Sequence, residues 1–411
     1  MPANLRSVLV AVALIAPAPA ALADVITDWD EKGVAFVTPR MPPPATERAM
    51  AMVNTAMFDA VNSIERRYRP YLAQLPAAPT TSKEAAAAAA AGTVLAALLP
   101  QAEGEVKAAM ATYLASIPNS DAKSEGIKLG EAVAGKILAA RANDGANAPD
   151  SYRPQTRPGI YVPTQATVLP MWPNVKPFGM TSGSQFRPPA PISLKSEQWA
   201  ANYNELKDYG GATSQKRSAR QTEDARFWFM TGAQSLHPLA RQLVAAKKMS
   251  LIDSARFMAI TAVAAADAYI AVMDAKYHYE FWRPVTAIRN GDRDDNPATE
   301  RDAAWQPLGV TPMHPEYPCA HCINSASLAA VVETMLGTAD VPELTLTSPT
   351  ASGVTHRWTN MWAYANEVAE ARIWAGFHYR FSNRVGQDMG RKIGDYVVKN
   401  VMQPAGVAGV R

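Results

Sequence analysis

Apolar positions recur at intervals of three and four along most of the chain, which predicts helices. The stretch from Ala45 to Tyr68 shows the pattern well, because it follows a proline cluster and then presents one apolar stripe. A similar stretch begins at Asp121, an expected N-cap. No segment alternates convincingly between apolar and polar residues, so no strand is predicted. The predicted helices cover about 45–68, 83–100, 121–144, 196–208, 218–230, 237–275, 322–337, 358–375 and 384–402.

Two apolar stretches have the composition of core helices rather than of membrane spans. Residues 83–100 are rich in alanine, which favours helix strongly but is only weakly lipophilic. Residues 257–274 are more apolar, yet Asp267 stands in their middle, which is typical of a core helix of a soluble protein. Between about 145 and 195 the chain is rich in proline and aromatic residues, which predicts an ordered wrapping loop. The expected fold is an all-α helical bundle with this long Pro-rich loop.

The first residues have the features of a secretory signal. Arg6 precedes an apolar run from Val8 to Ala16, and Ala21-Leu22-Ala23 forms a cleavage site of the A-x-A type. The run is too short to span a membrane, although an uncleaved anchor is the alternative. We expect residues 1–23 to be removed before Asp24, giving a secreted or periplasmic protein in a compartment where disulfides persist.

Composition then narrows the function classes. The chain has 411 residues, of which 48% are hydrophobic and 19% charged, with a formal net charge of +3. These values are typical of a globular protein, and the absence of Lys/Arg runs gives no reason to expect a nucleic-acid partner. We expect one all-α domain over 24–411, with N-terminal helices and the Pro-rich loop in 24–195 and a catalytic region in 220–400.

Candidate chemistry lies in three separated blocks. In the first, Lys276 and Arg283 are seven residues apart, so on one helix they would face the same side, and Pro284 predicts that the helix ends at Arg283. In the second, Arg372 and His378 flank Gly376, a residue that could end a helix and turn both side chains into one pocket. Buried cations need an anion. The alternatives are a solvated basic face and an ordinary histidine at a helix end.

The third block contains the only two cysteines of the chain, Cys319 and Cys322, with His321 between them. A helix is predicted to begin here, so His321 would lie beside backbone N–H groups that attract anions. The cysteines could instead form a redox pair, half of a zinc site or a structural disulfide. Haem attachment is excluded because Ile323 follows where histidine is required.

Together the three blocks resemble the superfamily that joins type 2 phosphatidic acid phosphatases, bacterial acid phosphatases and vanadium-dependent haloperoxidases, in its secreted bacterial haloperoxidase-like branch. The family pattern K-x6-R-P, P-S-G-H and S-R-x5-H-x3-D is matched in order and spacing over about residues 220 to 400. In this chain it reads Lys276…Arg283-Pro284, Pro318-Cys319-Ala320-His321 and Ala371-Arg372…His378…Ser382.

The resemblance implies roles for these residues. Lys276, Arg283 and Arg372, with Cys319 and the backbone of Ala320, would bind an oxyanion. His378 would be the ligand of vanadium or the nucleophile toward phosphorus, and His321 the acid/base opposite. His314 stands where vanadium bromoperoxidases have histidine and chloroperoxidases an aromatic residue.

Two departures from the pattern bear on activity. Cys319 replaces a serine whose hydroxyl would donate to the anion, and a disulfide with Cys322 would remove even the weaker thiol donor. Ser382 replaces the aspartate that would orient His378, and Asp388 or Asp267 are the candidates to replace it.

The preferred function is therefore a vanadium-dependent haloperoxidase-like peroxidase with vanadate as cofactor, acting on peroxide and halide. The sequence EFWRP, which contains Arg283, is closer to haloperoxidases than to the small acid phosphatases. The alternative is an acid phosphatase without a cofactor, which would act on a phosphate ester through a phosphohistidine at His378. A degenerate oxyanion binder is the third hypothesis. The sequence leaves the oligomeric state open.

Overall fold

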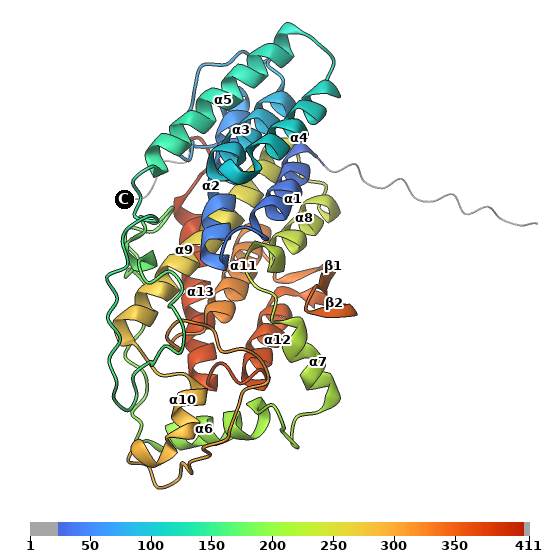
Figure 1. Cartoon of the computed structure of the whole chain (residues 1–411). Coiled ribbons are helices and arrows are strands. Elements are labelled where there is room, and N and C mark those ends of the chain that lie inside the picture. The colour runs from blue at the N-terminus through green and yellow to red at the C-terminus, as the bar shows by residue number, and fades with distance from the viewer. Residues whose placement is uncertain (1–23, 407–411) are drawn as a thin grey trace, which may run out of the picture.

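The computed structural model describes residues 24–406, which form an elongated bundle of α-helices (Figure 1). The expected signal, residues 1–23, lies outside this range. The all-α fold is thus confirmed. The helices are α1 (Val25–Val37), α2 (Pro43–Glu65), α3 (Lys83–Leu98), α4 (Glu103–Ala115), α5 (Asp121–Arg141), α6 (Glu197–Gly210), α7 (Ala219–Phe227), α8 (His237–Ala246), α9 (Leu251–Tyr279), α10 (Pro284–Arg289), α11 (Ala320–Leu336), α12 (Met361–Trp374) and α13 (Arg380–Asn400). Short 3₁₀ turns lie at Pro100–Ala102, Trp172–Asn174, Ala233–Ser235 and Gly291–Arg293.

The centre of the bundle is α9, which packs against α2, α11 and α13. Its length and apolar composition would allow it to cross a membrane, but 94% of its most apolar window is buried inside the molecule, as expected of a core helix. Asp267, in the middle of α9, is fully buried and accepts hydrogen bonds from the backbone N–H groups of residues 178 to 180. The carboxylate is thereby compensated inside the core.

Close contact between α11 and α13 depends on three glycines of α13, spaced four residues apart. A Cβ atom built on Gly386, Gly390 or Gly394 would lie 2.6, 2.3 or 2.6 Å from a backbone oxygen of the α11 segment. Positions four apart share one helix face, so the three glycines form a smooth strip against α11. This contact fixes the helix that carries His321 against the one that follows His378.

Two element predictions were wrong. The stretch 237–275 is two helices, because Lys248 takes a left-handed conformation and Ser250 then caps α9 through Asp253 N–H. Ser120 rather than Asp121 caps α5.

The structure also contains a β-hairpin where no strand was predicted. Its strands, β1 (Asp340–Ser348) and β2 (Ala351–Asn360), are antiparallel and lie beside α7, α8 and α12 (Figure 1). Leu344 and Leu346 on β1 and His356 and Trp358 on β2 point inward. The alternation was missed because it covers few residues and the pairing register shifts near both ends of the hairpin.

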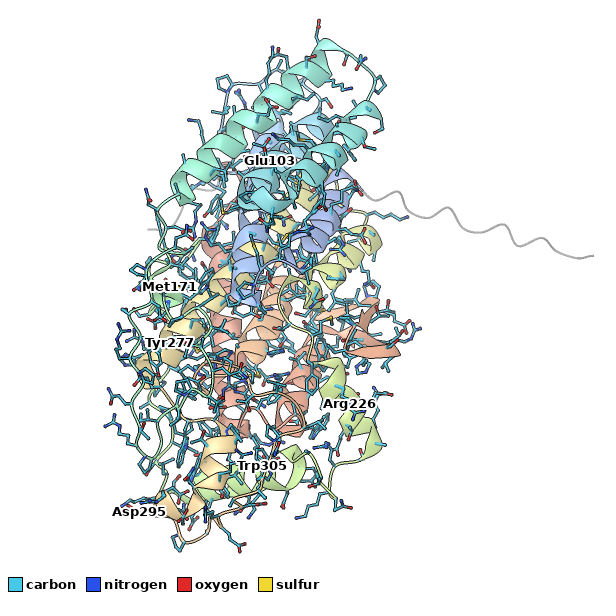
Figure 2. The ribbon with its side chains drawn as sticks, in the orientation of Figure 1. Glu103, Met171, Arg226, Tyr277, Asp295 and Trp305 are labelled. Atoms are coloured by element: carbon cyan, nitrogen blue, oxygen red, sulfur yellow. A yellow bond between two sulfur atoms is a disulfide. The ribbon has the colours of Figure 1, made fainter. Side chains whose placement is uncertain are left out.

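The Pro-rich segment between 145 and 195 is an ordered connection that wraps around the bundle, as predicted. The Tyr277 hydroxyl of α9 donates to the carbonyl of Val168 at 3.0 Å, and Arg187 forms a paired hydrogen bond with Asp274. Figure 2 shows Met171 of this segment and Tyr277 on the same side of the molecule. The segment therefore covers the C-terminal half of α9.

Candidate functional site

The three sequence blocks meet at the ends of α9, α11 and α12. Lys276 lies in the last turn of α9 and His321 in the first turn of α11, while Arg372 lies in the last turn of α12. His378 follows α12 directly, because Gly376 takes a positive φ of 79° and reverses the chain. Arg283 does not extend from α9 as expected: α9 ends at Tyr279, and Arg283 is the N-cap residue of α10.

Backbone carbonyl groups hold the first two cations in place. Lys276 Nζ donates to the carbonyls of Pro315 and Glu316 at 2.8 and 2.7 Å. Arg283 donates from Nε to the carbonyl of His314 at 2.8 Å and from Nη1 to that of Phe377 at 3.0 Å. Both side chains are essentially inaccessible to solvent. They are therefore fixed in position without a neutralising partner of their own.

Arg372 and His321 each carry a buried nitrogen with no hydrogen-bond partner in the described structure. Arg372 donates from Nη1 to the carbonyl of Trp228, and its guanidinium lies 4.8 Å from the centre of the Phe377 ring. Its Nε is left without a partner, as is Nε2 of His321. A buried polar atom without a partner is costly, so these two nitrogens indicate where a ligand would bind.

A carboxylate that was not predicted orients His378. Glu316 Oε1 lies 2.8 Å from His378 Nδ1 and also accepts from the N–H of Tyr379 at 3.1 Å. The expected substitutes are wrong: Asp388 pairs with Lys392 on the surface, and Asp267 binds the Pro-rich connection. The sequence signal for this role was the carboxylate of Glu316, three residues before Cys319.

Glu316 determines the tautomer of His378. A carboxylate at Nδ1 makes that nitrogen the donor, so the Nε2 lone pair of the neutral ring is free to bind an electrophile. Nε2 lies 3.4 Å from Arg283 Nη1 and faces the cavity described below. Burial, reinforced by the positive charges of Arg283 and Lys276, holds the pKa of His378 well below its usual range. The ring is therefore neutral near pH 7.

The pKa shifts of the other groups follow from burial and, for Lys276 and Arg372, from the positive charge of Arg283. Burial lowers the pKa of Arg372 to about 9 and that of Arg283 to about 10, and it lowers the pKa of Lys276 well below its ordinary value. Burial raises the pKa of Glu316 to about 7, even though Lys276 and Arg283 favour its ionised form. One carboxylate thus stands against three buried cations, an imbalance that a bound anion would relieve.

A cavity of about 480 Å³ opens onto this cluster. His314, His321, Arg372 and His378 line one part of it. His314 Nδ1 accepts from Arg283 Nη2 at 3.0 Å, which places the ring proton on Nε2. The remaining wall is mostly apolar and includes Phe229, Met273, Val310, Pro312, Met313 and Phe377. The cavity therefore combines a cationic end with an apolar surface suited to an organic or weakly hydrated substrate.

The prediction that Cys319 donates to the anion was wrong. Cys319 and Cys322 form a disulfide, and both residues are fully buried outside the lining of the cavity. Without an S–H group, Cys319 has no side-chain proton to donate. Its sulfur instead accepts from the N–H of Cys322 at the start of α11. Ala320 does line the cavity, so its backbone remains available there.

The donor set fits a tetrahedral or trigonal-bipyramidal oxyanion such as phosphate or vanadate. The fit rests on the two partnerless nitrogens, the excess of buried cations and the open lone pair of His378. Cationic groups around helix termini are an established way to bind such anions.

Comparisons with known proteins point the same way. A family model described as the VCPO second helical-bundle domain matches residues 256–406. The vanadium chloroperoxidase of Curvularia inaequalis is 27% identical over 152 residues, which are 30% of this chain and only 24% of the chloroperoxidase.

Solved structures share the fold over most of the chain. A bacterial vanadium-dependent iodoperoxidase has a TM-score of 0.79 at 22% identity, covering 93% of this chain and 97% of its own. Apo and holo forms of a bacterial vanadium-dependent chloroperoxidase have TM-scores of 0.72 and 0.71 at 17% and 18% identity, each covering 87% of this chain and 93% or 91% of its own. The segment 256–406 is thus similar to the second helical-bundle domain of that family, and most of the chain shares the fold of these bacterial structures.

Proposed function

We propose that the protein is a vanadium-dependent haloperoxidase that uses hydrogen peroxide to oxidise halide. The observation that carries the proposal is the group of three buried basic side chains, Lys276, Arg283 and Arg372, with the single carboxylate of Glu316 as counter-charge. Arg372 lines the cavity, and Arg283 contacts His314 and His378, which also line it. The relatives named above are haloperoxidases by their descriptions.

Each residue has a role that its geometry supports. His378 Nε2 would hold the vanadium, and the three cations would bind the oxygens of vanadate. His321, whose Nε2 has no partner, would exchange a proton with a ligand in the cavity. His314 would present its Nε2–H to the same space. Vanadate, when bound, supplies a Lewis acid that activates peroxide toward halide.

The apolar wall of the cavity supports the choice of halide as substrate. Its phenylalanine, methionine, valine and proline side chains offer few polar groups to a hydrated ester. A large halide ion is weakly hydrated and gives up water at low cost, so such a wall suits it. The wall would also limit water near an oxyanion bound there, which would strengthen its electrostatic contacts.

One observation favours a second candidate, an acid phosphatase that acts through a phosphohistidine. Glu316 gives His378 the carboxylate that Ser382 does not provide. A histidine oriented in this way is also a competent nucleophile, and the same cations would stabilise a transferring phosphoryl group. The pair Glu316–His378 therefore fits either reaction, and activity must decide.

The deciding experiment compares His378→Ala with His278→Ala. His278 is exposed on α9 and stands outside the cavity, so its variant is a matched control. Wild type and His278→Ala should oxidise bromide or iodide with peroxide once vanadate is added, and phosphate should compete. His378→Ala should show no vanadate-dependent oxidation. Phosphate-ester hydrolysis without halide oxidation would establish the phosphatase, and phosphate binding without either reaction a degenerate binder.

We also propose that the protein is exported. The Cys319–Cys322 disulfide suits an oxidising compartment, and the signal features of residues 1–23 are those of a cleaved leader. N-terminal sequencing of material from the native host should begin at or near Asp24. A full-length product in the membrane fraction would contradict the proposal.

A further inference from the structure

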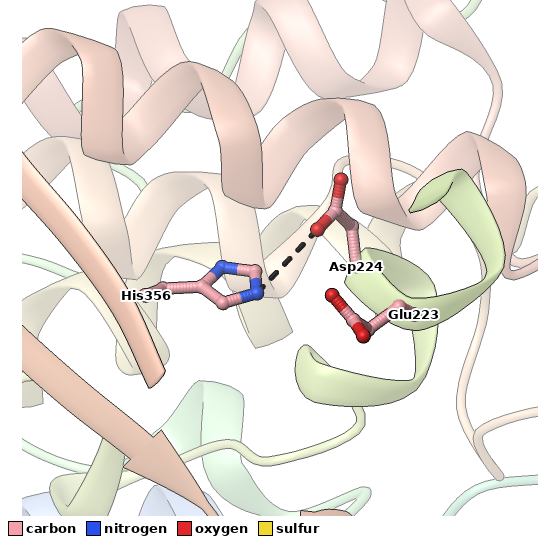
Figure 3. Close-up of side chains that lie close together, drawn as sticks. All are labelled: Glu223, Asp224 and His356. Atoms are coloured by element: carbon pink, nitrogen blue, oxygen red, sulfur yellow. Dashed lines mark ion pairs between the residues drawn. The ribbon is translucent and has the colours of Figure 1, made fainter. Parts of the chain in front are cut away.

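His356, Glu223 and Asp224 form a second cluster outside the cavity of the oxyanion site. His356 comes from β2 and the two acidic residues come from α7, and Figure 3 shows the imidazole facing both carboxylates. His356 is 2% exposed and Asp224 7%. Each residue offers one ligand atom, and these atoms all lie within 4.8 Å of one another.

The tautomer of His356 is set from its other side. Its Nδ1 lies 2.5 Å from Glu367 Oε1 on α12, and the same carboxylate accepts from the indole N–H groups of Trp228 and Trp358 at 3.0 and 2.9 Å. A neutral His356 therefore donates from Nδ1 and presents the Nε2 lone pair to Asp224. The Phe227 ring stacks on the imidazole at 3.9 Å between ring centres and restricts its rotation.

The arrangement leaves lone pairs facing each other. His356 Nε2 lies 3.4 Å from Asp224 Oδ1 and has no hydrogen-bond partner in the described structure, whereas Asp224 Oδ1 forms an ion pair with Arg220 Nε. Two acceptors at this distance repel unless a proton or a cation lies between them. The nearby cation is Arg220, which contacts Glu223 at 3.2 Å and Asp224 at 2.9 Å, but its side chain is 64% exposed and does not contact His356.

From this geometry we infer a binding site for a divalent metal ion of the zinc class, with His356 Nε2, Asp224 and Glu223 as protein ligands. One imidazole and two carboxylates are ligands that zinc accepts, and a fourth position would remain for water. Tetrahedral coordination at about 2.1 Å needs ligand atoms roughly 3.4 Å apart, so a modest movement of the partly exposed Glu223 completes the site. Glu367 has the role of the outer carboxylate that orients a ligating histidine.

The metal would join three elements near the oxyanion site. It would link α7 to β2 directly and to α12 through Glu367. The carbonyl of Trp228, next to α7, accepts from Arg372. The ion would thus stabilise the segment that positions this arginine, without contact with the cavity itself.

The test uses the whole mature protein without a tag, after treatment with a chelator. Zinc chloride is titrated into it, binding is measured by calorimetry, and stability is measured by thermal unfolding. We expect one zinc per chain and a higher Tm. Glu223→Gln should weaken zinc binding at least tenfold, whereas Glu343→Gln, an exposed glutamate of β1, should leave it unchanged. Arg220→Ala should tighten binding, because it removes the cation that competes for both carboxylates.

The location is checked separately by anomalous diffraction from zinc-soaked crystals, with a peak expected between His356 Nε2 and Asp224. Absence of saturable binding would mean that no metal ion bridges His356 and Asp224, and the inference would fail. It would equally fail if Glu223→Gln bound zinc as tightly as wild type. Because Glu223 is not a core residue, its variants avoid the folding defect that a change at His356 could cause.

Discussion

At the residue scale, we expect Glu316 to make anion binding at the oxyanion site depend on pH. Burial raises the pKa of Glu316 to about 7, whereas Lys276 and Arg283 favour its ionised form. Its carboxylate contacts His378 Nδ1. Below that pH the carboxyl is protonated and neutral, so the net positive charge around the cavity increases. Above it, the carboxylate cancels part of that charge. Anion affinity should therefore increase as the pH falls through about 7.

Glu316→Gln should remove most of this pH dependence. The glutamine oxygen can still accept from His378 Nδ1–H and Tyr379 N–H, but it carries no charge at any pH. At pH 8 the variant should bind phosphate about tenfold more tightly than wild type, and at pH 5.5 the two should agree. Calorimetric titration measures both, and comparison at each pH cancels the titration of phosphate itself. Parallel pH profiles for the two proteins would show that Glu316 does not titrate in this range.

Glu316→Ala tests orientation rather than charge. Without an acceptor at Nδ1, the His378 ring loses its fixed tautomer and rotamer. We expect vanadate-dependent activity to fall about 10- to 100-fold, as for other outer carboxylates of ligating histidines, whereas Glu316→Gln retains more activity. The comparison is made from kcat and vanadate affinity at pH 8. Equal losses in the two variants would mean that the carboxylate only fills space.

Among the elements, α11 and α13 show how backbone contact positions the site. At Gly390 of α13, a Cβ atom would lie 2.3 Å from the Ile323 carbonyl oxygen of α11. Gly390→Ala must separate the two helices, and we expect the free energy of unfolding to fall by about 1–3 kcal/mol. Chemical denaturation measures the change.

Gly135 provides the matched control for that substitution. It lies in α5, where an added Cβ would meet no atom within 4 Å. Gly135→Ala should raise the free energy of unfolding by up to about 1 kcal/mol, because alanine favours helix more than glycine does. If both alanine variants were stabilised, α13 would tolerate a wider separation from α11 than the structure indicates.

The same elements show what could be predicted from the sequence. Helix α1 was not predicted, although its burial repeats with the helical period, but α2, α5, α6 and α13 were placed to within a few residues on that pattern. Helix α4 was not, since Val106 is its only fully buried residue and no stripe forms. The hairpin 340–360 was missed because only a few inward side chains alternate.

The site residues that could be predicted are those that stand in short sequence motifs with fixed spacing. Lys276, Arg283, His321, Arg372 and His378 occur in recognisable blocks, and the fold places those blocks at adjoining helix ends. Glu316 could not be assigned, because its contact with His378 arises only when chain segments 62 residues apart meet. The state of the cysteines likewise depended on local geometry, which the sequence left open.

At the scale of the whole molecule, the Pro-rich connection joins the N-terminal helices to the cavity. Asp267 of α9 accepts from the N–H groups of Phe178, Gly179 and Met180 at 2.6, 2.8 and 2.7 Å, and so anchors this connection to the core. Earlier in the same connection, Val168 lines the cavity and donates its N–H to the carbonyl of Met313 at 2.8 Å. The anchor and the cavity wall therefore belong to one segment.

Asp267→Asn should release this segment without unfolding the bundle. An amide has one accepting oxygen, so at least one of the three buried N–H groups would face an NH₂ group, at a cost of about 1–3 kcal/mol. We expect faster limited proteolysis within residues 145–195 and weaker phosphate binding, since a wall of the cavity is loosened. Asp274→Asn is the control: it removes the partly exposed pair with Arg187 on the same connection, which is worth about 1 kcal/mol or less. Equal protease resistance in the two variants would show that the connection is held by its proline and aromatic contacts alone. A difference confined to Asp267→Asn would instead show that one buried carboxylate in the central helix secures the wall of the oxyanion site.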